Sequence, residues 1–311
     1  MSIQPNTAVF LMGPTASGKT DFAIELSKQF PVRLISVDSA LIYKGMDIGT
    51  AKPNAETLRQ YPHQLINICN PEDSYSAFDF VQDAKTQIQI AFNNNETPIL
   101  VGGTAFYFNA LEHGLSDLPE STPESREKFT QLLCEKGAST LHQDLATIDP
   151  TAAKRIHPND AQRITRALEV FDISGKTLTE LQGNKQLGLT YPVKKIILMP
   201  PRPELHARIE QRFLSMIDND FLAEVKTLKQ NPALHEDLPS IRCVGYRQAW
   251  QYLNNEIDKS TMIEKSIIAT RQLCKRQSTW LRNEPNALTL EMPDITKAIE
   301  FIHNERPLHD S

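Results

Sequence analysis

The chain has 311 residues, of which 40% are hydrophobic, so it is long enough for one large domain or two ordinary ones around a sizeable core. It has no run of 18 apolar residues, which excludes a membrane-spanning helix, and its first seven residues are uncharged, unlike a secretory signal. The formal net charge of −5 argues weakly against a nucleic-acid partner, because an average hides local clusters.

The first 115 residues or so alternate between predicted strands and helices. The predicted strands are 9–12, 32–37 and 98–101, and the predicted helices are 21–30 and 78–92. Such alternation is typical of a parallel sheet with right-handed crossovers, so we expect an α/β fold with helices flanking the sheet.

The middle of the chain changes character. A polar, proline-containing stretch begins at Ser116, and helical patterns replace strand signals up to Tyr191, most clearly in 161–173. A buried strand returns at 195–199, and the remainder has a largely helical pattern. We therefore expect a core formed by 1–115 and 192–311, the latter ending in a helical part, with a helical insertion at 116–191.

The four cysteines, Cys69, Cys134, Cys243 and Cys274, are widely spaced and include no CxxC pair. This spacing is typical of reduced cysteines and predicts neither a zinc site nor a disulfide framework. The chain is expected to be cytoplasmic.

A phosphate-binding loop follows the first predicted strand and precedes the first helix. Its sequence, G-P-T-A-S-G-K-T, comprises Gly13, Pro14, Thr15, Ala16, Ser17, Gly18, Lys19 and Thr20. In this pattern the backbone N–H groups surround phosphate oxygens, the lysine contacts the terminal phosphate and the threonine hydroxyl binds Mg²⁺. The pattern predicts a site for a phosphorylated molecule, with Thr20 as the protein ligand of Mg²⁺, but does not identify that molecule.

Two more polar segments end predicted strands at the sheet edge where ligands bind in open α/β folds. Asp38 ends the second strand, where it could serve the site or cap a helix. Gly102-Gly103-Thr104 ends the third strand and fits either a tight turn with a capping threonine or a part of the site. The acidic residue that holds Mg²⁺ in ordinary ATPases and GTPases is missing, since Val101 is followed by glycine.

Three basic clusters stand out in this net-acidic chain. One is the turn Arg242–Arg247, in which Tyr246 could stack a base; another is segment 265–283, which contains no acid. If that segment is helical, Arg271, Lys275 and Arg282 share a face. The third cluster lies in the predicted helix 161–173, where Gln162 and Arg166 lie opposite the apolar side and Arg163 lies on its flank. Each cluster alone could be a solvated face, whereas the set favours binding to a phosphate backbone.

These residues resemble the tRNA dimethylallyltransferase (tRNA isopentenyltransferase) family, over about residues 8 to 283. The matching motifs are Gly13–Thr20, Ile35–Pro53, Tyr75–Phe80, Leu100–Thr104, Arg155–Arg163, Arg166–Phe171, Arg242–Gln248 and Thr270–Gln277. The combination is far more specific than a phosphate loop alone. The segment after Asn283 has no zinc-finger pattern, so the chain is similar to the short bacterial form, with a P-loop NTPase-like core.

The resemblance implies transfer of a dimethylallyl group from dimethylallyl diphosphate to N6 of the adenosine 3′ to a tRNA anticodon. Asp38 would be the base that takes the proton from this amine, and Thr104 would lie beside the amine. Lys19, the loop N–H groups, Mg²⁺ at Thr20 and Arg212 would bind the diphosphate. The acceptor base would have to leave the RNA stack to reach them.

The resemblance also implies a surface for the tRNA anticodon stem-loop, formed partly by the insertion. Its residues would be Asp38, Ser39, Ala40, Leu41, Thr104, Arg126, Gln162, Arg163, Arg166, Arg242, Cys243, Val244, Gly245, Tyr246, Arg247, Arg271, Lys275, Arg276 and Arg282. We expect the chain to act as a monomer, away from membranes.

Two other functions remain open from the residues themselves. A small-molecule kinase using ATP would explain the phosphate loop and Asp38 but would leave the basic clusters without a role. A non-catalytic RNA-binding switch would explain those clusters but would leave Asp38 and Thr104 without one. Retention of labelled ATP against labelled dimethylallyl diphosphate would distinguish these alternatives.

Overall fold

The structure is a computed structural model that describes residues 6–183 and 188–304. The chain divides into two compact units, one formed by Met1–Glu112 with Thr190–Ser311 and the other by His113–Leu189. In the described part of the chain, no helix is both long and apolar enough to cross a membrane.

The larger unit is built on a six-stranded parallel sheet with the order β3-β2-β4-β1-β5-β6. The strands are β1 (Ala8–Met12), β2 (Val32–Val37), β3 (His63–Gln64), β4 (Thr97–Gly102), β5 (Val193–Leu198) and β6 (Ala287–Leu290). The prediction of a parallel α/β sheet is confirmed, and all four predicted strands are present. Two edge strands were missed: β3 has only two residues, and β6 lies in a segment predicted to be helical.

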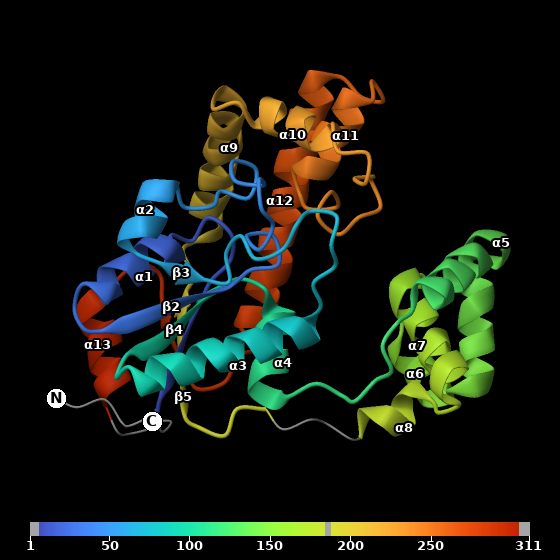
Figure 1. Ribbon diagram of the computed structural model, residues 1–311, viewed down its shortest axis with the longest axis horizontal. Coiled ribbons are helices and arrows are strands. Elements are labelled where there is room, and N and C mark those ends of the chain that lie inside the picture. Colours follow the sequence, from blue (N-terminus) through green and yellow to red (C-terminus); the bar gives the residue numbers. More distant parts are fainter. Residues whose placement is uncertain (1–5, 184–187, 305–311) are drawn as a thin grey trace. The chain divides into compact units, whose positions relative to one another are not determined.

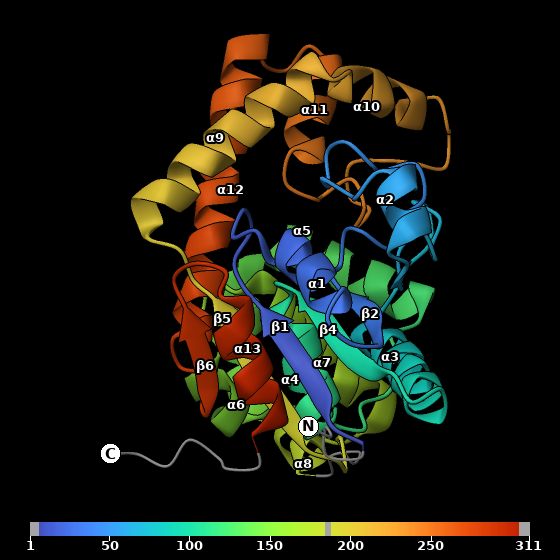
Figure 2. The same cartoon turned by 90° about the vertical axis from the view of Figure 1, so that its left-hand side faces the viewer.

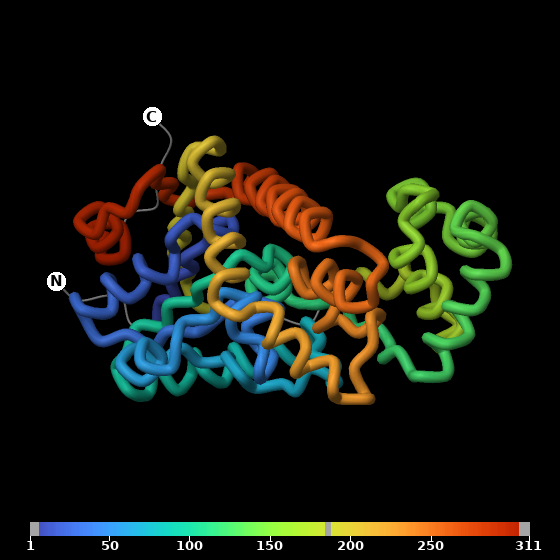
Figure 3. The backbone as a smooth tube through the Cα atoms, turned by 90° about the horizontal axis from the view of Figure 1, so that it is seen from above, coloured from blue at the N-terminus to red at the C-terminus, as the bar shows by residue number. Residues whose placement is uncertain are grey.

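Both segments of the larger unit contribute to this sheet, because β1 pairs with β4 on one side and with β5 on the other. In Figure 3, the blue-to-cyan and yellow-to-red parts of the chain therefore lie side by side. Residues Val9 to Met12 are fully buried at the centre, as expected for a parallel strand covered on both faces.

Helices cover both faces of the sheet (Figure 1). On one face, α1 (Lys19–Ser27) and α13 (Ile295–His303) pack with β1, β4, β5 and β6 in one apolar cluster. On the other face lie α3 (Ala77–Asn93) and α4 (Ala105–His113), where the Phe108 ring contacts Phe10 of β1 at 4.9 Å between centroids. A short helix, α2 (Ala55–Gln60), precedes β3.

Four more helices rise beyond the carboxyl ends of the strands (Figure 2). They are α9 (Arg202–Asp218), α10 (Phe221–Lys229), α11 (Tyr246–Leu253) and α12 (Lys259–Leu281). Their core includes Phe213, Phe221 and Trp250 and extends to Tyr43 and Met46 in the segment after β2. These helices therefore stand over the sheet edge that carries the predicted site.

The smaller unit is helical, with α5 (Pro123–Ile148), α6 (Pro150–Arg155), α7 (Ala161–Ser174) and α8 (Leu178–Gln182). Gly137 breaks α5 with a φ of 75°, a left-handed conformation that glycine adopts without a steric penalty. Leu141, Ile164 and Leu168 form part of its own apolar core. The helix predicted at 161–173 is confirmed as α7.

Candidate active site

The phosphate loop joins β1 to α1 through two left-handed residues. Ala16 has a φ of 64° and Gly18 a φ of 87°, so the backbone turns sharply before the helix begins at Lys19. The Lys19 ammonium folds back over the loop and donates to the carbonyl of Pro14 at 3.1 Å. The loop and the start of α1 thus form the predicted phosphate site.

The charges of Lys19, Arg212 and Asp38 are close enough to influence one another. The pKa of Lys19 is lowered to about 8, chiefly by burial and to a smaller extent by the nearby Arg212, while the negative charge of Asp38 raises it in part. Burial also lowers the pKa of Arg212, which Asp38 and Asp21 oppose. Burial therefore disfavours the positive charge of both side chains, and an anion bound beside them would stabilise both charges.

All three side chains line one cavity of about 880 Å³. Its wall continues through the ends of β2 and β4, the segment 49–54, and residues of α9 and α12. The predicted site residues that line it are Thr15, Ala16, Gly18, Lys19, Thr20, Asp38, Ser39, Ala40, Leu41, Thr104, Arg212, Arg242, Cys243, Val244, Tyr246 and Arg276. Its size suits a small diphosphate together with part of a second substrate.

Asp38 directly follows β2 and caps a turn, whereas a helix cap was one alternative that its sequence position allowed. Its Oδ1 accepts the N–H of Ala40 at 2.8 Å and that of Leu41 at 3.4 Å, which caps the following turn. The same carboxylate faces the cavity. These backbone bonds restrict its rotation, so a lone pair is presented to the cavity in a defined direction.

Thr104 lies beside this turn. Its Oγ1 accepts the N–H of Ser39 at 3.2 Å, and its own N–H donates to the carbonyl of Val37 at 3.3 Å. A hydroxyl that accepts in this way can still donate its proton. The ends of β2 and β4 therefore bring Asp38 and Thr104 together, as the parallel arrangement predicted.

Helix α9 contributes two arginines to the site, of which sequence reasoning identified only Arg212. The Arg212 Nη2 donates to the carbonyl of Thr50 at 3.4 Å. One turn earlier, the Arg208 Nη1 reaches the carbonyls of Ala16 and Ser17 at 3.4 and 3.5 Å. The i, i+4 spacing of the two arginines was the available signal, because it places both on the same face.

Two more polar side chains of the cavity wall were missed. Ser36 is buried, and no partner for its hydroxyl is present among the described residues. Its separation of two from Asp38 along the strand was a usable signal. His63 donates from Nδ1 to the carbonyl of Tyr61 at 2.8 Å, while its buried Nε2 has no partner in the described chain. Burial lowers the pKa of His63, so its neutral form is favoured.

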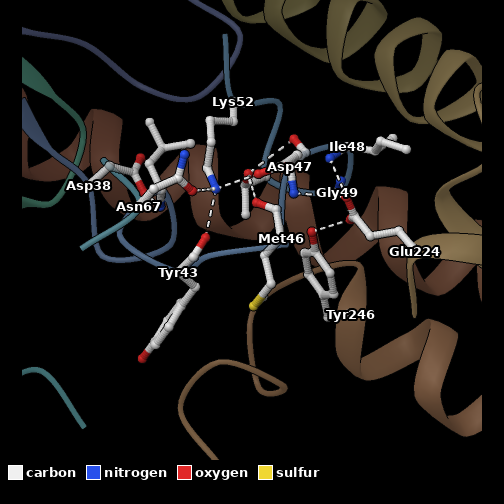
Figure 4. Close-up of polar contacts among 12 residues, drawn as sticks. Asp38, Tyr43, Met46, Asp47, Ile48, Gly49, Lys52, Asn67, Glu224 and Tyr246 are labelled. Carbon is white, nitrogen blue, oxygen red and sulfur yellow. Dashed lines mark hydrogen bonds and ion pairs between the residues drawn. The ribbon is translucent and has the colours of Figure 1, made fainter. Parts of the chain in front are cut away.

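Glu224 of α10 organises the segment that forms another part of the wall (Figure 4). Its carboxylate accepts the N–H groups of Asp47, Ile48 and Gly49 at 2.8, 2.7 and 3.2 Å. It also accepts the Tyr246 hydroxyl at 2.5 Å. No local sequence pattern indicates this role, because the partners are far apart in the chain.

Lys52 secures the other end of this segment. Its ammonium donates to the Tyr43 carbonyl, to Asp47 and to the Asn67 side chain, each at 2.6 Å (Figure 4). Segment 47–52 is thus held by Glu224 at its start and by Lys52 at its end. This fixes the position of the Thr50 carbonyl, which Arg212 contacts.

The turn Arg242–Arg247 is only partly the open surface that was expected. Arg242 is exposed and lines the cavity, and Arg247 is exposed on α11. The prediction that Tyr246 stacks a base is wrong, since its side chain is 0% exposed and packs edge-on against Phe221. Burial raises the pKa of Cys243 to about 12, so this thiol stays protonated.

Gly245 of the same turn has a φ of 91° and donates its N–H to the side chain of Gln248. Its role is therefore to reverse the backbone before α11.

The basic face of α12 is also divided. Lys275 and Arg282 are exposed, as predicted, and Arg276 lines the cavity. Arg271 differs because its guanidinium forms a 2.6 Å ion pair with Glu210 of α9. The segment itself contains no acid, as its sequence shows, but Arg271 finds an acidic partner on another helix.

Within the smaller unit, the predicted tRNA contacts have different surroundings. Gln162 is exposed. Arg163 is largely exposed, and its Nη1 forms an ion pair with Asp160 Oδ2 at 2.5 Å. Arg126 is exposed and donates to the Ser121 hydroxyl at 2.9 Å. Arg166 does not face outward as expected, because it pairs with Glu169 at 2.6 Å and donates to the Pro119 carbonyl.

The residues around the phosphate loop fit a metal ion carried by the substrate better than a resident one. No group of three or more His, Cys, Asp or Glu side chains in the described residues could hold a metal. Thr20 lines the cavity and can supply one hydroxyl oxygen. Mg²⁺ commonly keeps several waters and binds through few protein ligands plus phosphate oxygens, so this sparse donor set is compatible with it.

Known proteins match the chain over most of its length. The model of the IPP transferase family matches residues 41–284. A protein named tRNA dimethylallyltransferase from Ruthia magnifica subsp. Calyptogena magnifica is 70% identical over 96% of this chain and 98% of its own length. The protein of that name from Vesicomyosocius okutanii subsp. Calyptogena okutanii is 68% identical over 98% and 100%.

Among solved structures, the full-length tRNA isopentenylpyrophosphate transferase from Bacillus halodurans has a TM-score of 0.69 and 34% identity, over 96% of this chain and 94% of that one. With a cavity built on a phosphate loop and family motifs spread along the sequence, this chain belongs to the IPP transferase family.

Proposed function

We propose that the protein transfers a dimethylallyl group from dimethylallyl diphosphate to N6 of the adenosine 3′ to a tRNA anticodon. The observation that carries this proposal is the convergence of Lys19, Arg212 and Asp38 in one cavity. Two cations suit a diphosphate leaving group, while a carboxylate suits an amine that must lose a proton. The relatives named above support the same reaction.

On the donor side, the phosphate loop and Arg212 bind the diphosphate. As the allylic C–O bond breaks, its electron pair leaves with the diphosphate, whose bridging oxygen gains charge. Lys19 stabilises that charge more strongly in the transition state than in the ground state, which accelerates the reaction. Arg208, whose guanidinium lies against the loop carbonyls, helps to hold the loop in shape.

On the acceptor side, the N6 amine is a weak nucleophile because its lone pair is delocalised into the purine. As N6 forms its bond to the allylic carbon, Asp38 takes one N6 proton. The Thr104 hydroxyl orients the amine by hydrogen bonding. The adenine must be extruded from the RNA to enter this cavity.

Mg²⁺ would be held by Thr20 and by oxygens of the diphosphate, and when bound it would neutralise part of the leaving group's charge. The protein residues perform the proton transfer and the orientation of both substrates.

The tRNA would be held by exposed basic residues, some outside the cavity and one at its wall. Lys275 and Arg282 are suited to phosphates, and Arg242, at the cavity wall, is placed to reach bases. We propose that Gln162 and Arg163, in the smaller unit, also contact the tRNA. We further propose that the enzyme is a cytoplasmic monomer.

The test is transfer of label from dimethylallyl diphosphate to an anticodon stem-loop RNA. Wild-type protein should label only RNA with an adenosine at the acceptor position, and Asp38→Asn should lower turnover about 10²–10⁴-fold without weakening RNA binding. Labelled ATP serves as the comparison. Tight binding and use of ATP, with no labelling of RNA, would support a kinase and refute prenyl transfer.

A further inference from the structure

The phosphate loop and the Gly102–Thr104 turn meet a side chain that the proposed reaction does not use. We propose that Gln277 of α12 is a positioning residue that holds these two segments in register, so that the leaving diphosphate and the acceptor amine are presented at a fixed separation. This inference rests on the proposed function for the identity of the two reactants, whereas the positioning itself rests on geometry.

Both ends of the Gln277 amide are engaged. Its Oε1 accepts the N–H of Thr15 in the phosphate loop at 2.9 Å. Its Nε2 donates to the carbonyl of Gly103 at 2.9 Å. The amide supplies both an acceptor and a donor, whereas a carboxylate cannot donate and an ammonium cannot accept.

A side chain at Gly103 would have to displace the Gln277 amide. A Cβ placed on Gly103 would lie 2.5 Å from Gln277 Nε2 and 3.0 Å from the Gly13 carbonyl. The neighbouring N–H of Gly13 donates to the carbonyl of Gly102 at 3.3 Å. Gln277 thus closes a three-way junction of β1, β4 and α12.

This junction lies between the groups assigned to the two substrates. Thr15 belongs to the phosphate loop, which is assigned to the diphosphate, and Thr104, which is assigned to the amine, directly follows Gly103. Gln277 also adjoins Arg276 on the cavity wall. A small displacement between the groups that hold the two substrates should slow the reaction strongly, because reacting atoms must approach to about 3–3.5 Å.

The experiment compares Gln277→Met with Gln272→Met. Methionine keeps the length of glutamine and removes both hydrogen bonds. Gln272 is exposed on the same helix and serves as the matched control. The measurements are binding of inorganic diphosphate by calorimetry, the thermal midpoint, and kcat and KM for both substrates in the labelling assay.

We expect Gln277→Met to weaken diphosphate binding about threefold to tenfold, through loss of preorganisation. It should lower kcat about 10- to 100-fold, with the KM for RNA unchanged. The Gln272→Met protein should match wild type in every measurement. If Gln277→Met does not fold, Gln277→Glu tests the inference in its place. This variant keeps the shape of the side chain and the hydrogen bond with Thr15, but it cannot donate to Gly103. Its kcat should still fall.

A folded Gln277→Met protein with normal kcat and normal diphosphate binding overturns the inference, as does a lowered thermal midpoint with unchanged kinetics, which would indicate a purely structural role. Failure of the proposed function is visible separately, since wild type itself would then not label RNA. In that case the diphosphate titration still decides whether Gln277 positions the loop.

Discussion

The buried ammonium of Lys19 predicts that diphosphate binding weakens at moderately alkaline pH. Lys19 has a pKa of about 8 before the substrate binds, because burial and Arg212 disfavour its charge. Its charged form dominates below this pH and its neutral form above it, so the lost attraction appears as pH rises. About 90% of the lysine is protonated at pH 7 and about 10% at pH 9, so the Kd for dimethylallyl diphosphate should rise about tenfold.

Calorimetric titration of dimethylallyl diphosphate between pH 7 and 9, without RNA, measures this effect. The diphosphate is already ionised through this range, and therefore most of the change comes from the protein. Lys19→Arg is the control, since a guanidinium remains charged at pH 9 and the dependence should flatten. A wild-type Kd that does not change between pH 7 and 9, or an equal dependence in Lys19→Arg, would refute the reasoning.

Further substitutions test other contacts of the structure. Tyr246→Phe removes the hydrogen bond to Glu224 and should lower the unfolding free energy by about 1–3 kcal/mol in urea titrations; no loss would mean that the carboxylate finds another donor. Gly49→Ala would place a Cβ 2.2 Å from the Phe221 ring, so its thermal midpoint should fall clearly, whereas Gly183→Ala, which meets only an ordinary contact at 3.6 Å, should change little. Lys275→Ala and Arg282→Ala should each lower the salt dependence of RNA binding by about one unit or less. Arg271→Ala should lower the salt dependence of RNA binding less, because Glu210 already neutralises this side chain. An equal salt dependence for all three variants would contradict the neutralisation of Arg271 by Glu210.

Local sequence patterns were enough to predict the central part of the sheet and the phosphate loop. Strands β1, β2, β4 and β5 are each rich in apolar residues over a short stretch, and such stretches indicate buried parallel strands without knowledge of their neighbours. The glycine-lysine-threonine spacing of the loop is similarly local, because consecutive residues form it. The ends of parallel strands lie at one edge, so the proximity of Asp38 and Thr104 also followed from sequence.

Tertiary structure alone decided what each polar group contacts. Gln277 bonds to Thr15 across 262 positions, and Arg271 to Glu210 across 61, and neither separation leaves a periodic signal. The sequence around Tyr246 fits a base-stacking residue, but in the structure Phe221 and Glu224, from another helix, enclose its side chain. Local sequence encodes backbone preference and burial period, whereas pairing between distant side chains depends on how the elements pack. The chemistry of the loop was therefore readable from the chain, and the positions of its supporting residues were not.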